Sequence, residues 1–273
     1  MADNMKTQPT DEVLTAFNIN AKPTILAGGQ GTSYLCGKIV IKPEEDIEEA
    51  SWVAQTFSEL AIGEIRIPQP IKVNSGQWVY RGWSAHVFIE GETTKSRWAE
   101  KIQTCREFHK AVAHLKKPDF IGNRTHPWEI SDKMIWGEAE FKYGVELEPV
   151  LSRLHPLLKP IALKSQIIHG DMSGNILFHP SQKPAVIDFS PYWRPPEYAI
   201  AIIIVDAITW ENAPISLIDE LEDTIEMNQL LLRAAMWRIK TTEEFIKQYG
   251  GANIHDVLAY HPFIDALLNR NKL

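Results

Sequence analysis

The segment IIHGDMSGNILFHPSQKPAVID, residues 167–188, decides how the rest of the chain is interpreted. Apolar runs at 167–168 and 176–178 flank a polar loop that contains Asp171 and Asn175, and a third run at 185–187 leads to Asp188. We expect these runs to be buried strands, so that two carboxylates and an amide gather at strand ends. Mg²⁺ prefers such oxygen ligands and usually shares them with substrate phosphates. The segment therefore indicates a magnesium and phosphate site, and a nucleotide site is expected elsewhere in the chain.

The composition is that of an ordinary globular protein with a sizeable core, at 273 residues with 44% hydrophobic and 23% charged side chains. A net charge of −7 without a basic stripe argues against a nucleic-acid partner. The longest apolar run, residues 198–208, includes Asp206 and is shorter than the ~20 residues that span a bilayer. It predicts a buried helix and no membrane partner. The polar N-terminus has no signal-peptide run, and Cys36 and Cys105 are expected to be free thiols in a reducing cytoplasm.

Residues 24–42 predict three short strands, at Thr24–Ala27, Thr32–Cys36 and Ile39–Lys42. The turn Gly28-Gly29-Gln30-Gly31 lets the backbone approach another group closely, although a plain hairpin explains these glycines as well. Lys42 ends an apolar strand, where its ammonium must face either solvent or an anion. Residues 44–60 predict an amphipathic helix with an acidic first turn, and one of its glutamates is a candidate partner for Lys42.

Strand-rich sequence ends near residue 90, after predicted strands at Gln77–Tyr80 and Trp83–Phe88. The later sequence predicts helices over 97–115, from about 149, through Asp206 and over 216–247, with an irregular stretch at 116–143. We therefore expect an α+β protein of two lobes. Residues 1–90 form a small sheet-containing lobe, and residues 91–273 form a larger, mostly helical lobe.

The order of these features resembles the aminoglycoside phosphotransferase/choline kinase group of the protein-kinase-like superfamily. His169-Gly170-Asp171 stands where protein kinases carry His-Arg-Asp, and Asp188-Phe189 is followed by Ser190 instead of glycine. The resemblance implies a two-lobed fold, with an antiparallel sheet in the N-terminal lobe and the catalytic loop in the C-terminal lobe. A protein kinase is disfavoured because no Ala-Pro-Glu segment is present. A P-loop enzyme is excluded because G-x-x-x-x-G-K-[ST] does not occur.

The resemblance also implies roles within the catalytic segment. Asp171 would be the catalytic base, and Asn175 and Asp188 would hold Mg²⁺. His169 would brace the loop from behind, and Asp206 would support it. The reaction implied is transfer of the γ-phosphate of ATP, or of GTP, to a hydroxyl of a small molecule.

For the nucleotide, the resemblance implies a site in the N-terminal lobe. Lys42 would bind the α- and β-phosphates, oriented by Glu48, with Glu45 and Glu49 as competitors for that role. The backbone of Gly28, Gly29, Gln30 and Gly31 would cover the phosphates. The adenine would lie at the lobe junction, against Phe88, Ile89 and Glu90.

Two features of the sequence leave alternatives open. Three residues separate Asp171 from Asn175, where the familiar spacing has four, and we expect Gly174 in a left-handed conformation to tighten the loop. The short loop is also compatible with a pseudokinase or a nucleotide-binding regulatory module that transfers no phosphate. A cationic acceptor, such as an amino sugar, aminoglycoside or aminoalcohol, is suggested by the acidic stretch at 219–226, which a solvated helix face explains as well.

Overall fold

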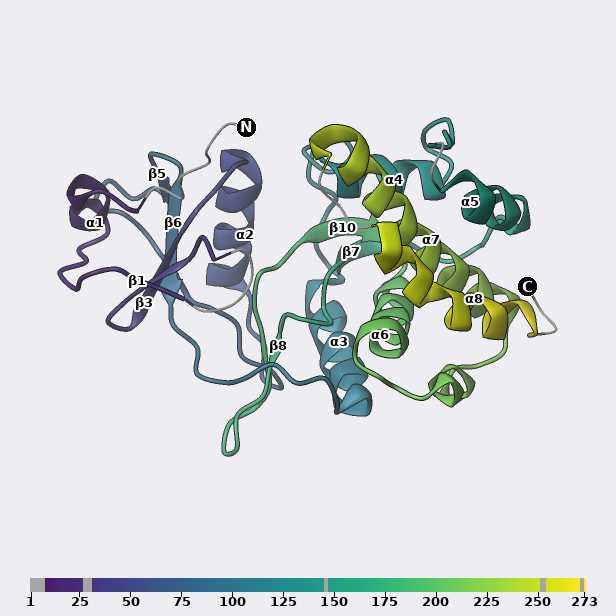
Figure 1. Cartoon of the computed structure of the whole chain (residues 1–273). Helices are drawn as coiled ribbons and strands as arrows, with labels where there is room; N and C mark the ends of the chain where they lie inside the picture. The colour runs from purple at the N-terminus through teal and green to yellow at the C-terminus, as the bar shows by residue number, and fades with distance from the viewer. Residues whose placement is uncertain (1–7, 27–30, 145–146, 251–253, 271–272) are drawn as a thin grey trace. The chain divides into compact units, whose positions relative to one another are not determined.

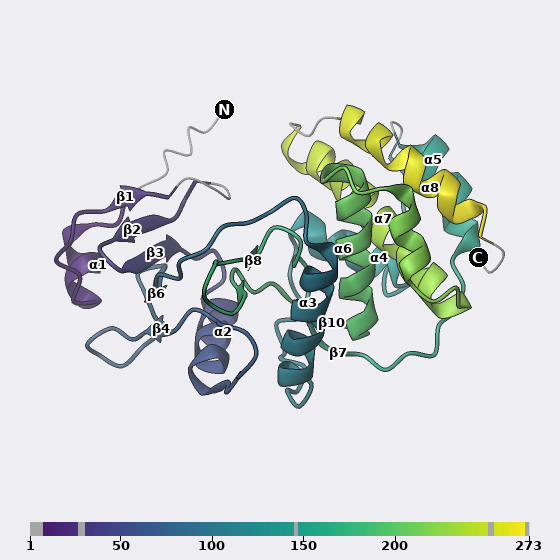
Figure 2. The ribbon, with the colours of Figure 1, turned by 90° about the horizontal axis from the view of Figure 1, so that it is seen from below.

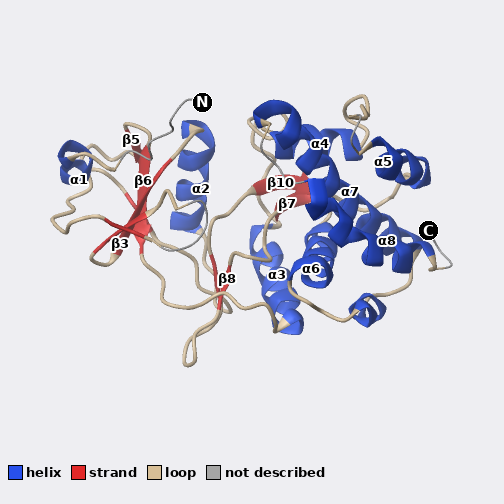
Figure 3. Cartoon of the chain, in the orientation of Figure 1, coloured by secondary structure: helices blue, strands red, loops and turns tan. Residues whose placement is uncertain are grey.

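The computed structural model describes residues 8–26, 31–144, 147–250, 254–270 and 273, and it divides into two compact units (Figure 1). The first unit comprises the chain up to Glu92 together with Leu177–Ile187, and the second comprises Thr93–Ile176 and the chain from Asp188 onward. Most strands belong to the first unit and most helices to the second, as Figure 3 shows. The predicted α+β fold, with an N-terminal antiparallel sheet and a largely helical C-terminal part, is confirmed.

The sheet of the first unit is antiparallel throughout. Its strands follow the order β1-β2-β3-β6-β4 (Figure 2). Strand β5 pairs with β6. The strands are β1 (Thr24–Ile25), β2 (Tyr34–Cys36), β3 (Ile39–Pro43), β4 (Pro70–Ile71), β5 (Val79–Tyr80) and β6 (Trp83–Val87). Arg81 and Gly82 both have positive φ angles, 49° and 75°, as a tight hairpin turn between β5 and β6 requires. The sequence did not predict β4, because two residues beginning with proline carry no strand pattern.

Helix α1 (Asp11–Ala16) and the sheet form the core of the first unit. Thr10 caps the helix by accepting the Val13 N–H, and the buried side chains Val13, Leu14 and Phe17 join one cluster with residues of the sheet that include Ile41. Because successive side chains of a strand point to opposite faces, Lys42 projects from the face opposite Ile41. Helix α2 (Ile47–Glu59) follows, capped by Asp46.

The hairpin of β8 (Ile176–Leu177) and β9 (Ala185–Val186) lies within the segment 167–188, and its residues 177–187 belong to the first unit. The Arg66 N–H donates to the Pro184 carbonyl at 2.8 Å, and Glu92 and Phe178 exchange two backbone hydrogen bonds at 2.9 Å. These contacts explain why one boundary near residue 90 does not describe the division of the chain completely.

The second unit is built around two buried helices. Helix α6 (Pro196–Trp210) is buried from Tyr198 to Ala207, as expected for a helix that is apolar all round. Helix α7 (Ile225–Tyr249) packs against α6 and α4 (Pro127–Ile135). The remaining elements are α3 (Trp98–Val112), α5 (Glu148–Leu154), α8 (His261–Leu268), the 3₁₀ helices η1 (His155–Leu157), η2 (Ile215–Glu220) and η3 (Ile254–Tyr260), and the antiparallel pair β7 (Gln166–His169) and β10 (Pro191–Arg194).

Helix α4 corrects the expectation of an irregular stretch at 116–143. His126 caps the helix by accepting the Glu129 N–H, and Pro127 occupies the first turn, where its missing N–H costs nothing. The same proline and the glycines around it made the segment resemble a loop. Within the described part of the chain, no helix combines the length and the apolar character needed to cross a bilayer.

Candidate active site

His169 supports the loop that carries Asp171 by accepting hydrogen bonds from backbone N–H groups. It ends β7 and is fully buried, and its Nδ1 accepts the backbone N–H of Asp171 at 3.1 Å and that of Ser190 at 3.5 Å. The Gly170 N–H donates to the Ser190 carbonyl at 2.9 Å. The backbone is thus fixed on both sides of the loop, and His169 has the bracing position that the family resemblance implies.

His109, on α3, is a second supporting residue. Its side chain is buried, its Nε2 accepts the His169 N–H at 2.9 Å, and its Nδ1 lies 3.3 Å from Cys105 Sγ. Burial, and then the proximity of His169, lower the pKa of His109 to about 3. The imidazole is therefore neutral at pH 7 and keeps the lone pair that accepts this hydrogen bond. Cys105 and His109 share one buried helix face, four residues apart, which was the available signal.

Asp171 presents an exposed carboxylate on this fixed loop, with 53% of its side chain accessible. Asn175 closes the short loop, because its Nδ2 donates to the Asp171 carbonyl at 2.7 Å and lies 3.4 Å from Oδ2. The expectation of a left-handed Gly174 is wrong, since Gly174 is not among the positive-φ glycines. A turn with the Asn175 N–H bonded to the Met172 carbonyl at 3.1 Å tightens the loop in its place.

Asp206 and Arg238 lie behind the same loop. Ser173 Oγ donates to Asp206 Oδ2 at 2.8 Å, as expected for a supporting aspartate. Arg238, on α7, donates from Nε to Asp206 Oδ1 at 3.0 Å and from Nη2 to Asp206 Oδ2 at 2.6 Å. Nη2 also donates to Asp171 Oδ1 at 3.1 Å. Burial acts to lower the pKa of Arg238, but Asp206 and Asp171 outweigh it and raise that pKa, so the guanidinium is charged.

Asn175 and Asp188 lie at one end of the β8–β9 hairpin, because one residue directly precedes β8 and the other follows β9. Asp188 is exposed and has a φ of 47°, a conformation that side-chain-bearing residues seldom adopt. An amide oxygen and a carboxylate are hard donors, and Mg²⁺ typically takes few protein ligands and completes its shell with water and phosphate. This donor set fits magnesium. Among the described residues, no cluster of three or more His, Cys, Asp or Glu forms a metal site.

Lys42, in the first unit, has an ion pair with Glu44 at 3.7 Å, and Glu44 Oε1 also accepts a hydrogen bond from Ser84. The expected partner Glu48 is exposed in the first turn of α2, and its pairing with Lys42 stays a prediction. Of the glycine-rich turn, Gly31 has a left-handed φ of 61°. Gly28, Gly29 and Gln30 lie outside the described residues.

The segment Phe88–Glu90 follows β6. The Phe88 N–H donates to the Lys38 carbonyl at 2.8 Å, and the Glu90 carbonyl accepts from Arg66 Nη2 at 3.0 Å. Two of the backbone groups expected near an adenine are thus engaged within the unit. A base bound here would use other groups of Phe88, Ile89 and Glu90.

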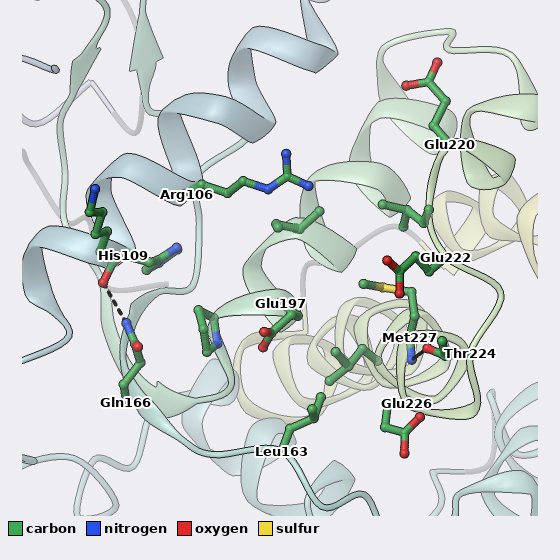
Figure 4. Close-up of a pocket in the computed structure, with 15 residues that line it drawn as sticks. Arg106, His109, Leu163, Gln166, Glu197, Glu220, Glu222, Thr224, Glu226 and Met227 are labelled. Carbon is green, nitrogen blue, oxygen red and sulfur yellow. Dashed lines mark hydrogen bonds between the residues drawn. The ribbon is translucent and has the colours of Figure 1, made fainter.

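The acidic stretch at 219–226 contributes to a separate cavity of about 780 Å³ in the second unit (Figure 4). Glu220, Glu222 and Glu226 line it from one side, and Arg106 and His109 on α3 line it from the other. The lining does not include Asp171, Asn175 or Asp188. The stretch therefore gives no structural support to a cationic acceptor at Asp171.

The fold is that of the protein-kinase-like phosphotransferases, and several solved structures share it. They include spectinomycin phosphotransferase APH(9)-Ia in complex with ADP and spectinomycin (14% identity, 96% of this chain and 97% of that chain, TM-score 0.56). A choline/ethanolamine kinase family protein from Mesorhizobium loti matches at 12% identity, over 97% and 96% of the chains, with a TM-score of 0.63. Aminoglycoside phosphotransferase APH(4)-Ia, with ADP and hygromycin B, matches at 14% identity, over 95% and 97%, with a TM-score of 0.61.

A sequence model of the phosphotransferase enzyme family matches residues 32–214, and this chain belongs to that family. No curated protein is detectably similar to the chain in sequence. The predicted family, fold and phosphotransferase class are thereby confirmed. The ADP in two of the neighbouring structures agrees with the predicted use of ATP.

Proposed function

We propose that this protein transfers the γ-phosphate of ATP to a hydroxyl group of a small molecule, with Asp171 as the base. Membership of the phosphotransferase family gives the reaction class. The observation that carries the assignment is the exposed Asp171 carboxylate on a loop whose backbone His169 fixes. An accessible carboxylate on a rigid support is what proton removal from a bound hydroxyl requires.

In the proposed step, the proton of the acceptor hydroxyl passes to the Asp171 carboxylate. The acceptor oxygen forms a bond to the γ-phosphorus, and the bond from that phosphorus to the oxygen bridging to the β-phosphate breaks, which leaves ADP. The protein contributes mainly position and charge to such a transfer. Arg238 and Asn175 limit the orientations open to the carboxylate, since they contact Oδ1 and Oδ2 respectively.

Asn175 and Asp188 would hold Mg²⁺, which neutralises charge on the nucleotide phosphates when bound. Lys42 would contact the α- and β-phosphates, with Glu44 and Glu48 as the candidate residues that orient it. The turn at 28–31 would cover the phosphates, and Phe88, Ile89 and Glu90 would contact the adenine. The protein would act in the cytoplasm, where its buried free cysteines, Cys36 and Cys105, stay reduced.

The acceptor is proposed to be an amino sugar, aminoglycoside or aminoalcohol. The proposal draws on the structural neighbours, which include a spectinomycin phosphotransferase, an aminoglycoside phosphotransferase with bound hygromycin B and a choline kinase. The experiment is MgATP consumption by the full chain with hygromycin B, spectinomycin, choline, ethanolamine and glucosamine as acceptors, with mass spectrometry of the products. A phosphorylated acceptor is expected. Thermal stabilisation by MgATP without consumption above the Asp171→Asn background would favour a regulatory module instead.

A further inference from the structure

Arg238 lies where helix α7 meets the loop that carries the proposed base. Its side chain is 8% exposed, and its guanidinium is fixed to Asp206 by two hydrogen bonds, at 2.6 and 3.0 Å. The rings of Trp128 and Trp237 lie 5.2 and 5.1 Å from the guanidinium carbon, within the range of cation–π attraction. A guanidinium with this many partners has a single well-defined position.

Asp171 contrasts with it. Its side chain is 53% exposed, and an exposed carboxylate rotates freely unless a partner holds it. Arg238 Nη2 lies 3.1 Å from Oδ1 and donates a hydrogen bond to it. Asn175 Nδ2 also donates to Oδ2, at the longer distance of 3.4 Å. Because Arg238 is anchored to Asp206 and makes the shorter contact, orientation passes from Arg238 to Asp171.

From this geometry we infer that Arg238 is a positioning residue, which holds Oδ1 of Asp171 and leaves Oδ2 to receive the acceptor proton. This inference rests on the proposed role of Asp171. The contacts close a ring, since Ser173 in the same loop bonds to Asp206, Asp206 bonds to Arg238, and Arg238 bonds to Asp171. Trp128 connects this ring to helix α4, so α4 and α7 together fix the direction of the base.

The rival explanation is that Arg238 only neutralises buried Asp206. Removing one partner of a buried ion pair usually destabilises a protein, so a loss of activity alone would not separate the two explanations. The two explanations differ in what happens when Asp171 is already disabled. A positioning residue then has nothing to position, whereas a purely structural residue is still needed.

The test uses Arg238→Met, which keeps an unbranched apolar stem but removes the charge, and Arg238→Lys, which keeps the charge but removes the planar fork. Arg233→Met is the matched control, because Arg233 is also buried on α7 and lies 5.2 Å from the Trp136 ring. Its side-chain hydrogen bonds go to Gln229 and the Lys159 carbonyl. Turnover of MgATP is measured with the best acceptor among hygromycin B, spectinomycin and choline, and with water if none reacts.

We expect Arg238→Met to lower kcat by about tenfold or more while KM for MgATP stays within about twofold, because misplacing a catalytic group by about 1 Å costs up to about a hundredfold. Arg238→Lys should recover part of kcat, and Arg233→Met should keep it. On an Asp171→Asn background, Arg238→Met should cause no further loss.

An equal fractional loss on both backgrounds would overturn the inference, as would an unchanged kcat in either Arg238 variant. The lysine variant keeps the test decisive if the methionine variant does not fold. If Asp171→Asn retains full activity, the proposed function of Asp171 fails, and that outcome is separate from failure of the inference about Arg238.

Discussion

The ring of Tyr192 occupies the space that a side chain on Gly170 would need. A Cβ built on Gly170 would lie 2.5 Å from Tyr192 Cδ2 and 2.7 Å from Cε2. The ring is itself confined, because Trp237 packs on it at a centroid distance of 5.3 Å and the guanidinium of Arg124 lies 4.6 Å from its centre. The position at which protein kinases carry arginine is therefore closed to side chains in this protein.

Gly170→Ala is accordingly expected to lower the free energy of unfolding by about 1–3 kcal/mol, the usual cost of overpacking a core. It should also lower kcat, because relief of the clash would shift the backbone at residue 170 and with it the adjacent Asp171. Urea unfolding and steady-state kinetics measure the two effects. Gly174→Ala is the matched control in the same loop, since a Cβ there meets nothing within 4 Å. A similar loss of stability in both variants would contradict the packing argument.

Asp171→Asn and Asp188→Ala should separate the base from the metal site. Asp171→Asn is expected to keep the thermal stabilisation by MgADP and to lose about a hundredfold or more in kcat, the contribution typical of a general base. Asp188→Ala should lose the magnesium-dependent part of the stabilisation. Asp119→Asn, which removes an exposed carboxylate from another loop, should change neither quantity. Undiminished transfer by Asp171→Asn would remove the base assignment.

Lys42→Ala is expected to weaken nucleotide binding, because the proposed contact with the α- and β-phosphates is lost. Glu44→Gln and Glu48→Gln compare the carboxylate that pairs with Lys42 in the structure with the one expected from the sequence. The ion pair at 3.7 Å predicts that Glu44→Gln raises KM for MgATP more than Glu48→Gln does. Isothermal titration with MgADP measures affinity directly, and a larger effect of Glu48→Gln would favour the pairing expected from the sequence.

His109 should make the protein less stable in acid. Its pKa is lowered to about 3 in the folded protein by burial first and by His169 second, whereas the unfolded value is near 6.5. Between these values the unfolded chain binds more protons, so the free energy of unfolding falls as the pH drops from about 6.5 toward 3, by up to about 1.4 kcal/mol per pH unit. This contribution is fully present above about pH 6.5.

His109→Gln tests this pH dependence, because a glutamine carbonyl accepts the His169 N–H without titrating. Urea unfolding of the wild type and the variant is compared between pH 4 and pH 8. The free energy of unfolding of the wild type should fall relative to that of the variant as the pH drops below about 6.5. Parallel curves over the whole range would show that His109 does not titrate on unfolding.

The sequence predicted those parts of the candidate site that are contiguous in the chain. Asp171, Asn175 and Asp188 fall within one segment, and the apolar run at 39–41 predicted the strand that ends near Lys42. It did not identify Arg238, which is 67 residues from Asp171, or the role of His109, which is 60 residues from His169. Such pairings depend on how α7 and α3 pack, and a single sequence contains no record of that packing.

Backbone conformation was the second feature that the sequence did not predict correctly. The short loop suggested a left-handed Gly174, whereas the positive φ lies at Asp188. Glycine permits such a conformation but does not require it, and hydrogen bonds formed after folding decide where the chain turns. Helix α4 was missed for a related reason, because proline at its first turn has the same appearance in a sequence as proline in a loop.

One nitrogen of His169 accepts backbone N–H groups from both Asp171 and Ser190, two residues beyond Asp188. A substitution that removes this acceptor would therefore disturb the segment of the proposed base and that of the proposed metal ligand together. Substitutions that adapt the site to another substrate can alter the surrounding helices one at a time. They cannot move these two segments independently while both donate hydrogen bonds to His169. His169 therefore couples the position of the proposed base, Asp171, to that of the proposed metal ligand, Asp188.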